Sequence, residues 1–404
     1  MAKSGVAFGS IALPNTVYRV SAIALICWSL FHFITSLFGS SDMSPSDAKA
    51  RARQALQQKI ETAVPGRDGF KVWSEDYFRD FYGSSECGLK STSIYNPFMN
   101  SDGSLMRPYC ANKEKLLSAF SEGGRIGFNS AYQPRDCEYR WFNPEEICMI
   151  LDRFDAVLFV GEQRMTTHLY AAFNSLLRKN IAWGGLKNWE LNEQLRQRCR
   201  CESQYTNSQC GGGGAGIGDH FIVDSTEILD AKDDANKIGA PYSCNRVFHG
   251  LVTVNSEPVA AGTLEDIDDI LTTYHKTAKP VPVILQQGLA HGFNWDKTTK
   301  VMDSILRQVE RREPNPNHRP FLWLGPTAAG HLKPPGAIIE QGNNALHHYT
   351  VELSKRARDR GFDVLNMFNL TIQADSYDGT MYGQEVSLVQ AMMVINWLSR
   401  VESL

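Results

Sequence analysis

A short apolar run that ends in a glycine and leads directly into a helix constrains this chain more than any other feature. The run is AVLFVG, residues 156–161, and the next residues are EQRMTTHLYAAFNSLL, in which apolar side chains recur at helical spacing. A buried strand that ends in a tight turn and opens a helix is typical of α/β enzymes, which place a nucleophile or a phosphate at that turn. We therefore expect a functional site around Gly161.

From about residue 151 onward, apolar strands alternate with amphipathic helices. The expected strands are residues 156–160, 220–223, 281–285, 321–324 and 364–368. The expected helices are residues 163–178, 186–198, 264–276, 297–311, 343–360 and 385–400. This alternation predicts an α/β fold of three layers, with helices on both faces of a doubly wound, five-stranded parallel sheet. Ligands of such sheets bind beyond the carboxyl ends of the strands, which brings Gly161, Gln287, Gly325 and the loop around Asp378 to one edge.

Residues 20–38, which begin with Val20 and end with Phe38, contain no Asp, Glu, Lys or Arg. A helix of this length, at about 1.5 Å per residue, spans roughly 28 Å, which is close to the hydrocarbon thickness of a bilayer. We expect a transmembrane signal anchor here, after a short cytoplasmic tail (residues 1–19) and before a polar stem (residues 39–66). A cleaved signal peptide and a buried core helix are the alternatives.

Cysteine usage bears on the orientation of the chain in the membrane. Cys27 lies in the apolar segment, and the remaining cysteines all follow it: Cys87, Cys110, Cys137, Cys148, Cys199, Cys201, Cys210 and Cys244. This even number favours disulfides in an oxidising lumen, whereas free thiols in a cytosolic protein are the alternative. No metal site is expected, because the spacing of Cys199 and Cys201 does not suit structural zinc. We expect a single-pass type II protein of the Golgi or endoplasmic reticulum membrane.

The remaining sequence divides into a cap and a larger domain. Residues 67–150 are rich in aromatic residues, cysteine, Gly and Pro, which predicts a loop-rich cap or insertion held by disulfides; residues 151–404 form the α/β domain. The formal net charge of -3 gives no electrostatic reason to expect a nucleic-acid partner. The glycine-rich residues 210–219 lack the Gly-Lys-Ser/Thr ending of a phosphate loop, so we expect a surface loop there and no cofactor.

The turn at Gly161 has a matching block near the C-terminus. FDVLNMFNL, ADSYDGTMYGQ and the helical EVSLVQAMMVINWLSRV follow one another there. Together these blocks resemble the first and last blocks of SGNH (GDSL-type) acyl-esterases. They are most similar to the PC-esterase branch, which includes plant trichome-birefringence-like proteins and the lumenal domains of fungal capsule O-acetyltransferases. The resemblance covers residues 151–404 in block order and loop position, and it implies an SGNH-like domain and a role in cell-surface glycan modification.

The two catalytic motifs of that family are altered in this chain. The family turn reads Gly-Asp-Ser and its late loop reads Asp-Gly-x-His, whereas this chain has Gly161-Glu162-Gln163 and Asp378-Gly379-Thr380-Met381. The amide of Gln163, at the nucleophile position, is no acyl nucleophile. The thioether of Met381, at the base position, accepts no proton at neutral pH. Of the family's catalytic nucleophile, base and aspartate, only the aspartate is retained, as Asp378.

Other residues at the same edge are candidates for binding or catalysis. Gly288 and Asn294 occur where the family has its Gly-x-Asn oxyanion block, and Asn294 or Gln287 is a candidate side-chain donor. Arg164 follows the turn and is a candidate anion ligand at the helix N-terminus, with a plain surface arginine as the alternative. His331 follows the fourth strand and is the best replacement base.

Two functions are compatible with this sequence. The favoured one is a non-catalytic lumenal protein, a pseudoenzyme that binds a glycan or an acylated polysaccharide, or that assists a glycan-modifying enzyme. The alternative is an active O-acetyltransferase or acyl-esterase that acts on polysaccharide through displaced residues such as His331. The loss of both the nucleophile and the base favours the first, because the two act as one unit.

Overall fold

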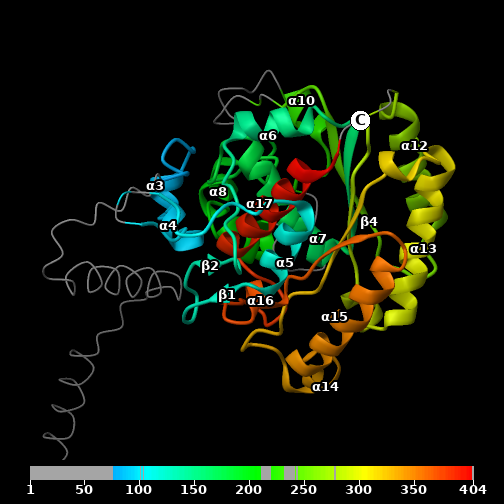
Figure 1. The fold of residues 1–404 in the computed structure, drawn as a ribbon. Helices are drawn as coiled ribbons and strands as arrows, with labels where there is room; N and C mark the ends of the chain where they lie inside the picture. The colour runs from blue at the N-terminus through cyan, green and yellow to red at the C-terminus, as the bar shows by residue number, and fades with distance from the viewer. Residues whose placement is uncertain are drawn as a thin grey trace, which may run out of the picture. The chain divides into compact units, whose positions relative to one another are not determined.

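The centre of the molecule is a parallel sheet. The computed structural model describes residues 76–100, 102, 104–210, 220–231, 242, 244–276 and 279–402. Five parallel strands lie in the order β4-β3-β5-β6-β7. They are β3 (Ala156–Gly161), β4 (Phe248–Thr253), β5 (Val283–Gln286), β6 (Phe321–Leu324) and β7 (Asp363–Leu365). Figure 1 shows helices on both sides of this sheet, and the predicted α/β fold with a five-stranded parallel sheet is confirmed.

One of the five predicted strands is wrong. Residues 220–223 form a single isolated bridge pair, Phe221 with Leu186, and the true neighbour of β3 is β4. The side chains of Phe221 and Ile222 are nevertheless buried, so this apolar stretch fills the core without joining the sheet. β7 is also shorter than predicted, because Phe368 begins the helix α16 (Phe368–Thr371).

Continuous apolar composition in the strands reflects burial on both faces. In β3, Val157 and Phe159 join one hydrophobic cluster, whereas Ala156, Leu158 and Val160 join a second one. Side chains of a strand alternate between the two faces of a sheet, so each face of β3 has its own core. The two clusters therefore lie on opposite sides of the sheet.

Six long helices cover the two faces. One face carries α12 (Ala261–Tyr274), α13 (Trp295–Arg312) and α15 (Asn343–Arg358), and the other carries α5 (Lys113–Glu122), α7 (Gln163–Leu177) and α17 (Gln384–Arg400). Every residue from position 386 to 398 of α17 is buried, because this helix packs against α7 on one side and against α5 and α6 (Pro144–Leu151) on the other. The first and last blocks of the family resemblance, at α7 and α17, are thus neighbours in space.

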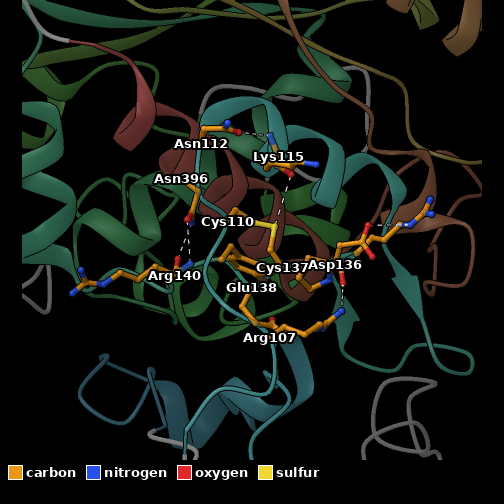
Figure 2. The surroundings of a disulfide bond; sticks show 12 residues. Arg107, Cys110, Asn112, Lys115, Asp136, Cys137, Glu138, Arg140 and Asn396 are labelled. Carbon is orange, nitrogen blue, oxygen red and sulfur yellow. Dashed lines mark hydrogen bonds and ion pairs between the residues drawn. A yellow bond between two sulfur atoms is a disulfide. The ribbon is translucent and has the colours of Figure 1, made fainter.

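The segment before β3 packs on α17. It contributes Phe120, Tyr139 and Trp141 to the same cluster as Trp397. The side chain of Asn396 adds two hydrogen bonds, since its Oδ1 accepts from Arg140 N at 3.2 Å and its Nδ2 donates to Arg140 O at 2.7 Å. Figure 2 shows this contact beside the disulfide between Cys110 and Cys137. Residues 76–150 therefore share one hydrophobic core with the sheet.

All eight cysteines that follow residue 39 form disulfides. The pairs are Cys87–Cys201, Cys110–Cys137, Cys148–Cys244 and Cys199–Cys210. The prediction of disulfides is confirmed, and four of them suggest an oxidising environment such as that of the secretory pathway.

The remaining elements are short. They are α3 (Ser84–Cys87), α4 (Ser91–Ile94), β1 (Gly124–Arg125), β2 (Tyr132–Gln133), α8 (Glu193–Arg198), α9 (Ser203–Thr206), α10 (Ser225–Asp230), α14 (Ile338–Gln341), and the 3-10 helices η1 (Ser208–Cys210), η3 (Leu289–His291), η4 (Pro316–His318) and η5 (Pro335–Ala337). The helix expected over residues 186–198 begins only at Glu193, because Asn192 caps it by accepting from Leu195 N at 2.9 Å.

Within the described ranges, no helix has both the length and the apolar composition that a bilayer crossing requires. The predicted tail, anchor and stem (residues 1–66) and the glycine-rich residues 211–219 lie outside the described residues.

Candidate functional site

The candidate site lies where β3 ends and α7 begins, at the carboxyl edge of the sheet. Gly161 is the last residue of β3, and a Cβ atom added to it would lie 2.1 Å from Thr166 Oγ1 and 2.5 Å from Gln286 O. No side chain fits there without displacing the backbone of β5. A glycine at this position therefore allows the tight turn into the helix.

The first turn of α7 is tied to two other loops. The backbone N–H of Gln163 donates to Asn255 Oδ1 at 3.1 Å, and the Nη2 of Arg164 lies 2.9 Å from Asp378 Oδ2. Both side chains of this ion pair are partly exposed, so it contributes little to stability. It does bring Gln163, Arg164 and Asp378, which are far apart in the sequence, to one place.

Asp378 also organises its own loop. Its Oδ1 accepts hydrogen bonds from Thr380 N at 2.8 Å and from Met381 N at 2.7 Å. Gly379 has φ +80°, and a Cβ atom on it would lie 2.1 Å from Lys333 N. The carboxylate that would orient a catalytic histidine in the family thus holds its own loop backbone and the guanidinium of Arg164 instead.

Met381 is buried next to His168, a histidine from the second turn of α7. Both residues line a cavity of about 20 Å³, together with Gln286 and Tyr382. The Nδ1 of His168 donates to Tyr382 O at 3.4 Å, and burial lowers the pKa of this imidazole to about 4, so it is neutral at physiological pH. A cavity of this size has room for about one water molecule.

Glu162 is an ionisable group at this turn that the family's catalytic motifs do not single out. Its Oε1 accepts from Gly288 N at 2.5 Å and its Oε2 accepts from Ala290 N at 2.8 Å, so it fastens the loop after β5 to the turn after β3. The side chain is almost completely buried, and this burial raises the pKa of Glu162 to about 7, against the opposing effect of the backbone hydrogen bonds. An acidic residue directly before a helix is the one sequence signal for such a role.

Three other predicted residues have local roles or lie apart. Gly288 adopts φ +150° beside Glu162, where a Cβ atom would lie 2.7 Å from Tyr349 Oη. Asn294 is exposed and caps α13, because its Oδ1 accepts from Lys297 N at 3.0 Å. His331 is exposed, with its ring centroid 6.2 Å from that of Phe128. In the part of the chain that the structure describes, neither Asn294 nor His331 makes a hydrogen bond or an ion pair to Asp378 or Met381.

In the described part of the chain, no three His, Cys, Asp or Glu residues are grouped closely enough to hold a metal ion. Comparisons with protein-family models, curated proteins and solved structures return no match for this chain. An α/β domain with a five-stranded parallel sheet hosts many unrelated functions. The function therefore has to be argued from the side chains at the site.

Proposed function

We propose that this chain is a non-catalytic, SGNH-like protein of the secretory lumen that binds a glycan and takes part in cell-surface glycan modification. It is held in the membrane as a type II protein by residues 20–38. The ligand is a glycan or an acylated polysaccharide, and a glycan-modifying enzyme is a candidate partner. The four disulfides support the lumenal location, and the resemblance of residues 151–404 to the PC-esterase branch supports the glycan.

One observation carries the non-catalytic assignment. The side chain at the family's base position, Met381, is buried against a cavity of about 20 Å³, and the side chain at its nucleophile position is the amide of Gln163. A nucleophile without a base, or a base without a nucleophile, supplies only half of the catalytic unit, and this chain has neither. Asp378, the retained member, is occupied by Arg164.

A fluorophosphonate probe, which labels activated serine hydroxyls, tests this assignment. The full-length protein in detergent is expected to stay unlabelled. Labelling that is lost in His331→Ala but kept in His348→Ala, an exposed histidine on α15, would establish the alternative of an active esterase or O-acetyltransferase with a displaced base.

A further inference from the structure

A second hollow lies at the opposite edge of the sheet from the candidate site. It has a volume of about 530 Å³, and its lining includes Asp152, Asp155, Asn245, Phe248 and Tyr274. These residues precede or begin β3, β4 and β5, and parallel strands begin at the same edge of a sheet. This amino-edge cavity is within the range of volumes that hold a small ligand or one sugar unit, whereas the cavity beside Met381 holds about one water molecule.

One wall of the amino-edge cavity is aromatic. The rings of Phe248 and Tyr274 stack with their centroids 4.0 Å apart and their planes at 12°. Phe248 is buried, and Tyr274 lies partly exposed over it. An aromatic wall of this kind presents a rigid apolar surface, which suits the C–H face of a pyranose ring.

Polar groups surround the aromatic wall, and some of them have no hydrogen-bond or ion-pair partner among the described residues. The side chains of Asn245, Thr273 and Lys276 line the cavity, are exposed, and make no hydrogen bond or ion pair with another described residue. An amide, a hydroxyl and an ammonium group together can donate to and accept from sugar hydroxyls. These three side chains are therefore available to a ligand.

The other charged groups of the cavity are already engaged. Arg246 pairs with the carboxylate of Asp152, and Lys279 Nζ donates to Asp152 O at 2.8 Å. Asp155 Oδ2 lies 3.0 Å from His275 Nδ1, and His275 Nε2 lies 2.9 Å from Glu313 Oε2. The ammonium of Lys276 is left as a charge that a ligand carboxylate can neutralise.

We propose that the amino-edge cavity binds a hexuronate unit of an acidic glycan, with the ring packed on Tyr274, its hydroxyl groups bonded to Asn245 and Thr273, and its carboxylate on Lys276. This inference rests on the proposed function and gives its ligand a class and a place. It puts glycan binding at the edge of the sheet opposite to the altered catalytic motifs.

Calorimetric titration of the full-length protein in detergent with tetrasaccharides of galacturonate and of glucose tests the proposal. Galacturonate is expected to bind more tightly than glucose. Tyr274→Ala, Asn245→Ala and Lys276→Ala are each expected to weaken galacturonate binding by about tenfold, a typical loss for a contact at the centre of a small site. Tyr274→Phe keeps the ring and is expected to keep most of the affinity, and Lys300→Ala on α13 is the matched surface-lysine control.

The outcomes separate this inference from the proposed function. Galacturonate binding that is weakened by Arg164→Ala and not by the cavity variants would overturn the amino-edge site and leave a glycan-binding protein. A wild-type protein that binds neither tetrasaccharide would overturn both. Because Asn245 and Lys276 are exposed, their substitution leaves the fold intact, and loss of binding in these variants reports on the cavity itself.

Discussion

At the residue scale, the buried carboxyl group of Glu162 couples folding to pH. Burial raises its pKa from 4.5 to about 7, so the folded chain holds a proton that the unfolded chain releases between these values. The free energy of unfolding therefore falls as pH rises from 4.5 to 7. A shift of one pKa unit corresponds to about 1.4 kcal/mol, so the loss reaches about 3 kcal/mol.

Glu162→Gln is expected to remove this fall, because an amide does not ionise. The comparison is between the urea midpoints of wild type and variant from pH 4.5 to 8. Their difference cancels the opposite contribution of the buried histidines, whose lowered pKa values make the protein less stable as pH falls. Parallel curves for the two proteins would show that Glu162 carries no such linkage.

The sequence indicates which residues lie at the candidate site, but it does not indicate which groups they contact. The spacing of strand, turn and helix located Gly161 and the start of α7, and the C-terminal block located the loop of Asp378. The ion pair between Arg164 and Asp378 joins residues more than two hundred positions apart, and no local pattern specifies it. No local pattern specifies the contacts of Glu162 either, since its N–H donors come from the loop after β5.

At the element scale, the sequence predicted four of the five strands and misplaced the fifth. β4 reads FHGLVT, and its histidine and glycine interrupt the apolar run by which buried strands are recognised. Residues 220–223 have the expected composition, but their bridge pair joins Phe221 to Leu186, and their backbone contact with β4 is the hydrogen bond from Leu251 N to Val223 O at 2.7 Å. Long-range pairing with β3, and not local composition, therefore decides which segment becomes the outer strand beside β3.

Hydrogen bonds at both ring nitrogens allow the polar side chain of His249 to be buried in β4. Its Nδ1 lies 2.8 Å from Tyr170 Oη, and its Nε2 lies 2.6 Å from Tyr242 Oη, so both ring nitrogens are satisfied in a fully buried position. His249→Ala removes the imidazole partner of both tyrosine hydroxyls, of which Tyr170 Oη keeps its hydrogen bond to the carbonyl of residue 249 at 3.1 Å, and it opens a cavity. This change is expected to destabilise the protein by about 3 kcal/mol. Urea denaturation measures this loss. The exposed His348→Ala is the control, and an equal midpoint for both variants would refute the structural role.

At the scale of the whole molecule, the disulfides differ in how much chain they enclose. Cys87 and Cys201 are 114 positions apart, whereas Cys199 and Cys210 are 11 apart. Loop-closure entropy gives about 5 kcal/mol for the long loop and about 3 kcal/mol for the short one. Replacing both cysteines of the long loop by serine is therefore expected to lower the urea midpoint more than the same change in the short loop. The reverse order would contradict this account.

The proposed orientation of the chain, with residues 39–404 in the lumen, can be tested directly. If residues 39–404 are lumenal, protease added to sealed microsomes is expected to leave the large domain intact until detergent opens the vesicles. Digestion without detergent would place the domain on the cytosolic side, where disulfides are rare.

The central claim is that the altered motifs have removed catalysis. The most direct test is to measure hydrolysis of an aryl acetate by the full-length protein. The wild type, Gln163→Ser and Met381→His are each expected to show no turnover above background. The double variant, which regains both a hydroxyl and a base beside Asp378, is expected to exceed the background by about tenfold. Robust wild-type turnover that survives Gln163→Ala and Asp378→Ala would show that catalysis occurs at another site and would contradict this account.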